Sequence, residues 1–323
     1  MSEFDLIRRL QEIICVNPAA EPAGCVIGIG DDAAVLAVPP HRQLVVSTDT
    51  LVEGIHFRPQ TLARDLGHKA LAVNLSDLAS MGAEPAWFFL ALTVPAIDSS
   101  WLDSFAHGMA ELAAQAGIEL AGGDTTAGPL SITITALGLV EPGKALTRAG
   151  AREGDLVVVS GELGAAAFAL KALAIGDIPD AASRSALDRP QPRLELGRRL
   201  QGLATSCIDL SDGLLADLGH ILRASGTGAE IELERLPGSD SLVGLDEAER
   251  LELQTSGGDD YELCFTIPPH REAELAHIAE QTDVRLTVIG EITAAPGLRC
   301  KTRQGGVYLP PGKGYEHFSM DSK

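Results

Sequence analysis

Two hydrophobic patterns alternate along the chain. Short apolar runs rich in β-branched residues predict strands, and apolar positions that recur every three or four residues predict helices. The expected strands lie at 44–49, 87–94, 118–121, 131–140, 156–160, 229–235, 261–267, 284–292 and 298–309. The expected helices lie at 63–81, 100–116, 193–204, 214–225 and 270–281, with another that begins near 165. This alternation is typical of an α/β or α+β architecture.

The chain is longer than a usual single domain, so we expect it to form two. It has 323 residues, and domains seldom exceed about 250 to 300 residues before they divide. A turn at 154–155 (Gly-Asp) opens a second series of elements. We therefore expect one domain at 1–149 and a second at 150–323, with a surface loop at 237–250.

Two of the expected helices carry further signals. Ser100 and Asp103 have the spacing of a capping box at the start of the helix at 100–116. The helix at 63–81 contains Asp77 in an otherwise apolar stretch. A buried carboxylate is costly unless a cation or hydrogen bonds compensate for it. Asp77 is therefore expected to be either a metal ligand or a buried cap.

The charge balance is strongly acidic. The chain has 45 acidic and 25 basic residues, a formal net charge of -20. This charge disfavours nucleic acid and anionic membranes as partners. It also means that a phosphorylated substrate would need divalent cations between its phosphates and the protein carboxylates.

Export and membrane insertion are not expected. No stretch approaches the roughly 20 apolar residues of a membrane span, and the start of the chain lacks the apolar core of a signal peptide. The five cysteines are scattered without a CxxC pair, as expected for reduced thiols. We therefore expect a cytoplasmic protein.

Aspartates recur where an apolar segment meets a glycine-rich or hydroxyl-rich turn. They are Asp31 and Asp32 in GIGDD, Asp49 in VVSTDT, Asp77 in NLSDLASMG, Asp124 in AGGDTT, and Asp209 and Asp212 in IDLSDG. Magnesium prefers hard oxygen ligands, usually one or two carboxylates with phosphate oxygens and water. One Asp beside Gly is most often a turn or a cap, the reading that we favour for Asp31. The whole set predicts several magnesium ions bound with a nucleotide.

Other residues could contact phosphate, each with a structural alternative. Gly122 and Gly123 would let the backbone approach a phosphate closely, or would form a tight turn. Arg148 could donate a forked pair of hydrogen bonds to phosphate, or lie on the surface. His56 could contact a phosphate, or be satisfied locally. The segment 159–164 could bind an anion at a helix start, but no Walker lysine follows it.

The motifs taken together resemble the thiamine-monophosphate kinase family from residue 28 to residue 318. They are GIGDD, STDTLVEGIHF, NLSDLASMGAEP, AGGDTT, ALTRAGAREGD, IDLSDGLLADL, SGGDDYELCF and GYEHF. The resemblance implies an N-terminal α/β domain whose sheet forms a barrel across a homodimer, and a C-terminal α+β domain that covers the nucleotide. It also implies ATP-dependent, magnesium-dependent phosphorylation of thiamine monophosphate to thiamine diphosphate.

The resemblance also implies roles for individual residues. The expected magnesium ligands are Asp32, Ser47, Thr48, Asp49, Asp77, Asp124, Asp209 and Asp212. The expected ATP contacts are Gly123, Asp124, Arg148 and Ser211. The expected contacts to thiamine monophosphate are His56, Asp259 and Tyr315. No catalytic base is assigned. The family commonly has Glu at the position of Asp259, so this contact would be a methylene shorter here.

Two other functions remain open at this point. One is another ATP-using enzyme on the same scaffold, similar to aminoimidazole ribonucleotide synthetase or selenophosphate synthetase. The latter would need a reactive cysteine or selenocysteine near the N-terminal glycine-rich segment, and Cys15 and Cys25 lack matching surroundings. The other is a non-catalytic module that binds magnesium and nucleotide.

Overall fold

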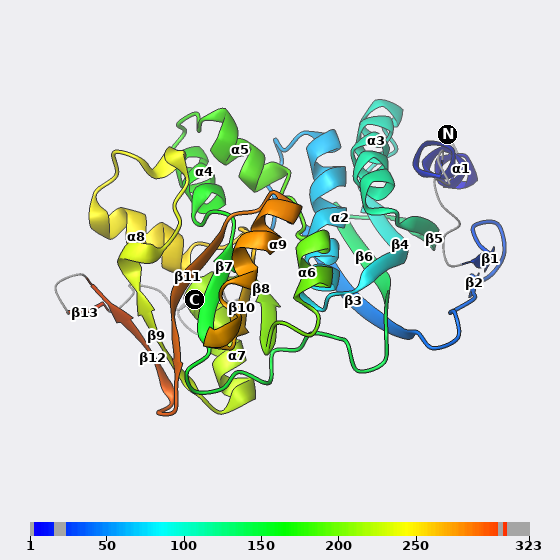
Figure 1. Cartoon of the computed structure of the whole chain (residues 1–323). Coiled ribbons are helices and arrows are strands. Elements are labelled where there is room, and N and C mark those ends of the chain that lie inside the picture. The colour runs from blue at the N-terminus through cyan, green and yellow to red at the C-terminus, as the bar shows by residue number, and fades with distance from the viewer. Residues whose placement is uncertain (1–2, 16–23, 303–305, 309–323) are drawn as a thin grey trace. The chain divides into compact units, whose positions relative to one another are not determined.

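The structure, a computed structural model, describes residues 3–15, 24–302 and 306–308. The contacts divide the chain into two units (Figure 1). The first unit comprises Met1–Leu78 and Ala83–Ala145, and the second comprises Ala79–Gly82 and Leu146–Lys323. Both units combine helices with sheets, which confirms the predicted mixed α/β content.

The first unit is built on a four-stranded sheet in the order β3-β6-β4-β5. The strands are β3 (Gln43–Val52), β6 (Ser131–Val140), β4 (Glu84–Val94) and β5 (Glu119–Ala127). The pairs β3–β6 and β4–β6 are antiparallel, and β4–β5 is parallel because α3 (Ser99–Ala116) connects these two strands. The other helices are α1 (Glu3–Ile14) and α2 (Ala63–Ser80), and β1 (Cys25–Ile27) pairs separately with β2 (Val35–Leu36). Figure 1 shows α2 and α3 over one face of the larger sheet.

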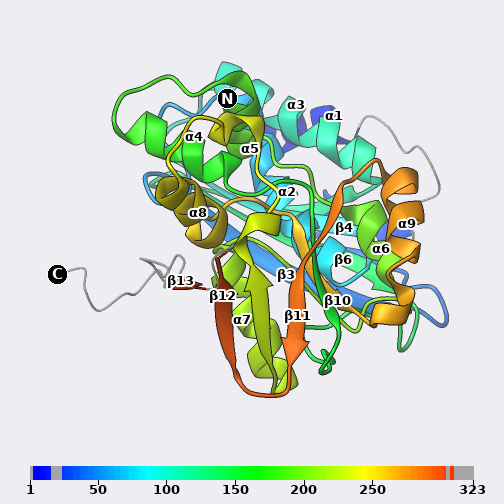
Figure 2. The ribbon, with the colours of Figure 1, turned by 60° about the vertical axis from the view of Figure 1, so that its left-hand side comes forward.

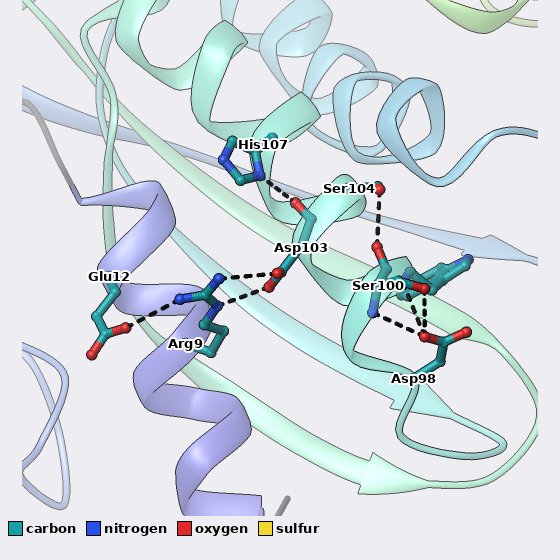
Figure 3. Close-up of polar contacts among 8 residues, drawn as sticks. Arg9, Glu12, Asp98, Ser100, Asp103, Ser104 and His107 are labelled. Atoms are coloured by element: carbon teal, nitrogen blue, oxygen red, sulfur yellow. Dashed lines mark hydrogen bonds and ion pairs between the residues drawn. The ribbon is translucent and has the colours of Figure 1, made fainter.

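The start of α3 differs from the prediction. Asp98 is the N-cap, and its carboxylate accepts hydrogen bonds from the backbone N–H groups of Ser100 at 2.9 Å and Trp101 at 3.3 Å (Figure 3). The expected Ser100/Asp103 capping box is therefore wrong, because Asp98 satisfies the first N–H groups of the helix. Asp103 instead accepts hydrogen bonds from Arg9 Nε at 2.8 Å and Nη2 at 3.0 Å, which join α1 to α3.

Helices α2 and α3 touch backbone to backbone. A Cβ at Gly108 of α3 would lie 1.7 Å from the Arg64 carbonyl oxygen of α2, and a Cβ at Gly67 would lie 2.0 Å from the Phe105 carbonyl oxygen. No side chain larger than hydrogen fits at either position unless the helices separate. These two glycines therefore fix how closely α2 approaches α3.

The second unit is built on a seven-stranded sheet in the order β13-β12-β9-β11-β7-β10-β8. The strands are β13 (Val307–Tyr308), β12 (Gly297–Lys301), β9 (Gly228–Glu232), β11 (Leu286–Thr293), β7 (Leu156–Ser160), β10 (Leu263–Ile267) and β8 (Ser206–Asp209). All neighbouring pairs are antiparallel except β12–β9.

Helices and short 3-10 turns connect the strands of the second unit. The helices are α4 (Ala165–Ala174), α5 (Ala181–Asp188), α6 (Leu194–Leu200), α7 (Leu214–Ser225), α8 (Glu247–Ser256) and α9 (Glu274–Thr282). The 3-10 turns are η1 (Leu233–Arg235), η2 (Asp240–Leu242) and η3 (Pro269–Arg271).

Successive residues of β7 pack into different cores. Val157 and Val159 join the core that contains α7, and Val158 joins the core that contains α6 and α9. Successive strand residues point to opposite faces, so the sheet carries a hydrophobic core on each side. Figure 2 shows α6 and α9 next to each other beside this sheet.

Most predicted elements are present, and several regions differ. The strand expected at 229–235 ends at Glu232, and 233–235 forms η1. The expected loop at 237–250 is wrong in part, because it contains η2 and the first turn of α8. The strand expected at 118–121 extends to Ala127, so AGGDTT lies within β5 rather than in a turn. The segment expected at 298–309 forms two strands, β12 and β13. Strand β8 and helix α5 were not predicted, because each is too short to show a clear period.

In the described part of the chain, no helix combines the length and the apolar character needed to cross a membrane.

Replacing Gly108 with Ala should lower the free energy of unfolding by about 1–3 kcal/mol or more, because the added methyl group forces the helices apart. Gly219 of α7 is the matched control, since the nearest atom to its added Cβ is the mobile end of Arg223 at 3.3 Å. Gly219→Ala should leave the free energy of unfolding unchanged or raise it by up to about 1 kcal/mol. Urea denaturation of both variants would test this, and equal effects would contradict it.

Candidate active site

In the first unit, β3 and α2 bring two aspartates together. Ser47 and Asp49 alternate with Thr48 along β3, so both face the same side of the strand. The Ser47 hydroxyl donates a hydrogen bond to Asp77 Oδ2 of α2, and the backbone N–H of Asp49 donates to Asn74 Oδ1 at 3.1 Å. The structure therefore groups Ser47, Asp49 and Asp77, three of the predicted magnesium ligands.

The Asp49 carboxyl group cannot easily ionise in this position. Burial, the nearby Asp77 carboxylate and the hydrogen bond between the two side chains together raise its pKa to about 7. Two carboxylates this close share a proton unless a cation stands between them. Binding of a cation at this pair would therefore displace the proton that the two carboxyl groups share.

The Asp49–Asp77 pair suits magnesium better than it suits a metal whose ligands all come from the protein. Within residues 3–15, 24–302 and 306–308, no three His, Cys, Asp or Glu side chains are grouped to hold a metal ion. Magnesium, however, usually takes one or two carboxylates and fills its shell with phosphate oxygens and water. Asp49 and Asp77 offer the hard oxygen atoms for the protein share of such a shell.

Two other predicted ligands lie on the opposite face of the same sheet. The Thr48 hydroxyl is 2.9 Å from the Thr135 hydroxyl of β6. Asp124 pairs with Ala91 of β4, and the cross-strand pairing places both in line with Thr50 of β3. Asp49 is the neighbour of Thr50 along β3, so its side chain points to the other face of the sheet. The structure therefore does not bring Thr48 and Asp124 to the Asp49–Asp77 pair.

Gly123 is needed for strand pairing, whatever else it does. A Cβ at this position would lie 1.9 Å from the Leu90 carbonyl oxygen of β4. Close contact between two backbones explains this glycine without a phosphate. Its predicted ATP contact stays a prediction.

The remaining predicted residues of the first unit lie in turns. Asp31 Oδ1 accepts a hydrogen bond from the Asp32 N–H at 2.9 Å, the turn arrangement that we favoured for Asp31. Asp32 is exposed in the same turn. His56 Nδ1 accepts a hydrogen bond from the Val52 N–H at 3.0 Å, which fixes the imidazole in the turn after β3. The turn thus sets which edge of the imidazole could meet a ligand.

In the second unit, three loops meet at one edge of the sheet. Strand β10 lies between β7 and β8 and is antiparallel to both. The loops that follow β7 and β8 therefore lie beside the loop that precedes β10. The Asp259 N–H donates to the Ser211 carbonyl oxygen at 2.9 Å, and the Tyr261 N–H donates to the Leu210 carbonyl oxygen at 2.7 Å. The predicted contacts Ser211 and Asp259 are thus adjacent. Asp209 is the last residue of β8, and Asp212 lies in the loop that follows it.

The segment before β10 holds two residues in the left-handed backbone region. Asp259 has φ 68°, which Asp tolerates, and Tyr261 has φ 49°, which residues other than Gly, Asn and Asp seldom adopt. The Tyr261 hydroxyl donates to Asp259 Oδ1 at 3.0 Å. Such strain is concentrated at functional sites in proteins, which agrees with a role for Asp259 in binding.

Arg148 lies near the same loops. Its charge and that of Asp212 both act on His220 of α7, and burial together with Arg223 and Arg148 lowers the pKa of that imidazole. The Arg148 carbonyl oxygen accepts a hydrogen bond from the Ser225 hydroxyl at 3.4 Å. Arg148, Asp212 and Ser211 therefore belong to one region of the second unit.

Several buried acids in this region were not predicted. Glu262 pairs with Arg193 through both guanidinium nitrogens that face it, with Nε 2.7 Å from Glu262 Oε2. Asp260 Oδ1 accepts from the Gly164 N–H at 2.9 Å, and burial raises the pKa of Asp260 well above its ordinary value. Asp217 accepts three hydrogen bonds from the loop after β8. The only sequence signal for Asp217 was an acid in the first turn after SDG.

Tyr315 lies outside the described residues, so its predicted contact with thiamine monophosphate stays a prediction.

The raised pKa of Asp49 predicts a pH-dependent stability in metal-free buffer. The folded state keeps the proton to a higher pH than the unfolded state, so Asp49 makes the protein less stable as pH rises from about 4 to about 7, by at most about 1.4 kcal/mol per pH unit. Asp49→Asn should remove this part of the loss. Urea denaturation in EDTA at pH 5 and pH 8 would measure it.

Asp103→Asn is the control for this measurement. Its hydrogen bond to Arg9 lowers the pKa of Asp103, so its contribution has the opposite sign and is lost as pH falls. If Asp49→Asn lost as much stability between pH 5 and pH 8 as the unmodified protein, the assignment of a shared proton would be wrong.

The family of the chain follows from comparison with known proteins. Residues 30–140 match the family model for AIR synthase related protein, N-terminal domain, and residues 152–302 match the model for the C-terminal domain. The two units thus have the architecture of this class of proteins. The chain is also 47% identical over 299 residues to thiamine-monophosphate kinase from Escherichia coli (strain K12), covering 91% of this chain and 92% of that protein. The chain belongs to the thiamine-monophosphate kinase family.

Solved structures agree with this family. Thiamine-monophosphate kinase from Stenotrophomonas maltophilia K279a superposes with a TM-score of 0.85 at 44% identity, covering 93% of this chain and 96% of that one. AaThiL complexed with AMPPCP and TMP superposes with a TM-score of 0.77 at 29% identity, covering 98% of this chain and 97% of that one.

Proposed function

We propose that the chain transfers the γ-phosphoryl group of ATP to thiamine monophosphate and forms thiamine diphosphate and ADP. The family supports this activity, and the AaThiL complex holds AMPPCP, an ATP analogue, together with TMP. The single structural observation that carries the proposal is the half-buried Asp49–Asp77 pair, in which a bound cation would favour the ionised form of Asp49. We place the reaction in the cytoplasm, in thiamine diphosphate biosynthesis.

Each domain contributes its own residues to this proposal. Domain 1–149 would bind metal and ATP and form the dimer, through Gly123, Asp124 and the acids of β3 and α2. Domain 150–323 would cover the nucleotide and contribute to the substrate site. The second unit holds its predicted ATP contact Ser211 beside the predicted substrate contact Asp259, and Arg148 lies near that loop.

We propose that magnesium is held at more than one place. Ser47, Asp49 and Asp77 would serve one ion or its surrounding waters, because they converge on one face of β3. Thr48 and Asp124 occupy the other face of the sheet, so we assign them to a separate ion. The other proposed magnesium ligands are Asp32 in the first unit, and Asp209 and Asp212 in the second. Bound magnesium supplies positive charge that offsets the repulsion between the two phosphates.

The reaction needs no protein base in this proposal. A phosphate oxygen of thiamine monophosphate attacks the γ-phosphorus, and the bond from that phosphorus to ADP breaks. The second pKa of a phosphomonoester is about 6, so the attacking oxygen already carries negative charge near neutral pH. Two unit charges about 4 Å apart repel by roughly 4 kcal/mol at an effective dielectric of about 20, which equals about three decades of rate.

The substrate contacts would orient the acceptor. The Tyr261 hydroxyl holds the Asp259 carboxylate, and the turn after β3 holds His56, so both side chains have a fixed direction before substrate arrives. Preorganised groups lose little entropy when a ligand binds. The cationic thiazolium ring would rest against Tyr315, a contact of roughly 0.5 to 2 kcal/mol.

Product analysis tests the activity directly. Purified protein is incubated with ATP, magnesium and thiamine monophosphate, and the products are separated by mass-resolved chromatography, with EDTA in the control. Thiamine diphosphate and ADP in equal amounts, both absent in EDTA, would support the proposal. Binding of magnesium-ATP without thiamine diphosphate would instead favour a binding module or another ATP-using enzyme. A stable phosphorylated protein on the path to product would exclude direct transfer.

Asp77→Asn should lower magnesium-dependent turnover by at least about 100-fold, the scale of removing a group that stabilises developing charge. The fold should stay intact, because Asn keeps the shape of the side chain. The control is Asp103→Asn, which removes a carboxylate from the same unit that pairs with Arg9 and lies outside the site motifs. Steady-state kinetics over a magnesium titration would measure both. Near-normal kinetics for Asp77→Asn would remove this residue from the metal site.

We also propose that the chain forms a homodimer through the sheet of the first unit. The face of β3 that carries Thr48 also carries Leu44 and Val46, which are 41% and 55% exposed. Exposed aliphatic side chains along one face of a strand are typical of an interface. A second copy of the sheet would cover them and form the predicted barrel.

Val46→Glu should convert the dimer to a monomer, because the charge would have to be buried in the interface. Val243→Glu is the control, since Val243 is 81% exposed and lies in the second unit. Light scattering at the working concentration would give the mass of each variant. A monomeric mass for the unmodified protein would refute the dimer.

A further inference from the structure

The loop between β8 and α7 is held by one carboxylate oxygen. Asp217 Oδ2, in the first turn of α7, accepts hydrogen bonds from the N–H groups of Ser211 at 3.1 Å, Asp212 at 3.1 Å and Gly213 at 3.2 Å. Consecutive N–H groups that point to one place form a site for an anion. Here the anion is part of the protein, so the loop is shaped before any ligand arrives.

The carbonyl groups of the same loop are also engaged. Leu210 and Ser211 accept hydrogen bonds from the N–H groups of Tyr261 and Asp259. Gly213 has φ 115°, and a Cβ there would lie 3.0 Å from the Ser256 carbonyl group. The loop is therefore held between Asp217 on its N–H side and the segment before β10 on its carbonyl side.

This arrangement has a cost that a simple helix cap would avoid. Asp217 is 3% exposed, and burial with the charge of Asp212 raises its pKa to about 7 although the three N–H groups favour its ionised form. A Ser or Thr hydroxyl could cap the same helix without a buried charge. One oxygen atom that accepts hydrogen bonds from three N–H groups fixes three consecutive residues at once, which a hydroxyl cap does not.

We propose that Asp217 is a positioning residue that sets Ser211 and Asp212 for magnesium-ATP and, through the carbonyl groups of the loop, sets Asp259 for the phosphate acceptor. The inference rests on the proposed function, since that function gives Ser211, Asp212 and Asp259 their roles. Asp217 itself touches no reacting atom. It couples the two halves of the binding region, because a shift of the loop moves both sets of contacts.

The sign of the effect on ATP binding separates positioning from charge. Removing a negative charge beside Asp212 should strengthen the binding of an anion if electrostatics alone matters. Loss of positioning should weaken that binding instead. Asp217→Ala should therefore raise the Kd for magnesium-ATP, and the KM for both substrates, by at least about ten-fold, equal to about 1.4 kcal/mol.

Two conservative variants keep the test informative if Asp217→Ala folds poorly. Asp217→Asn keeps an oxygen at the same position and should raise the Kd by at most about three-fold, since a neutral acceptor forms weaker hydrogen bonds. Asp217→Glu keeps the charge but moves it by a methylene group, so it should impair binding more than Asp217→Asn. The opposite order would show that charge, and not position, is what Asp217 provides.

Asp180→Ala is the matched control for lost stability. The Asp180 carboxylate caps α5 in the same unit and accepts hydrogen bonds from the N–H groups of Ala182 and Ser183, both at 3.0 Å. Its loss should lower Tm, as expected for a missing cap, and leave both KM values unchanged. An equal rise in KM for Asp180→Ala and Asp217→Ala would overturn the proposal.

Isothermal titration of magnesium-ATP into each full-length variant, below its Tm, provides the first readout, and steady-state kinetics the second. A Kd for Asp217→Ala within two-fold of the unmodified value would refute the positioning role. If the unmodified protein makes no thiamine diphosphate, the proposed function fails, and the titration still tests whether Asp217 shapes the nucleotide site.

Discussion

A carboxylate removed from water must receive a proton, N–H donors or a cation, and this requirement governs the candidate site in both units. Asp49 and Asp77 share a hydrogen bond in the absence of a cation, and Asp217 collects three N–H groups from one loop. Glu262 takes the guanidinium of Arg193. These three arrangements differ, because only the Asp49–Asp77 pair leaves negative charge that a bound cation could neutralise.

Different structural features position the acidic residues in the two units. In the first unit, alternation along β3 sends Ser47 and Asp49 toward α2 and Thr48 to the other face. In the second unit, the order of β7, β10 and β8 brings three loops to one edge. The arrangement of the candidate residues therefore depends on strand register in the first unit and on loop hydrogen bonds in the second. Changes to loop residues should be tolerated in the first unit more readily than changes of register.

Much of the fold could be predicted from periodicity, and the motifs supplied the candidate residues that the structure groups at Ser47, Asp49 and Asp77. Helix α7 and strands β6 and β7 are where the hydrophobic pattern put them, because each has a full period of apolar positions. The pattern did not show that β5 continues through AGGDTT, because glycines that touch a neighbouring backbone look like turn residues in a sequence. The partners of Asp217 and Glu262 depend on loops and strands packed together in space, which no local spacing reveals.

The close approach of α2 and α3 at Gly67 and Gly108 bears on the proposed choice of ion. Helix α2 carries Asp77, and its backbone rests on that of α3 with no side chain between them to change rotamer. The same helix is joined to β3 by the hydrogen bond from the Ser47 hydroxyl to Asp77. Calcium needs longer bonds to oxygen and accepts irregular shells, whereas magnesium demands short bonds and regular geometry. If Asp77 holds magnesium as proposed, a helix fixed in this way would disfavour the larger ion, so Gly67 of α2 and Gly108 of α3 would contribute to selection by ionic radius.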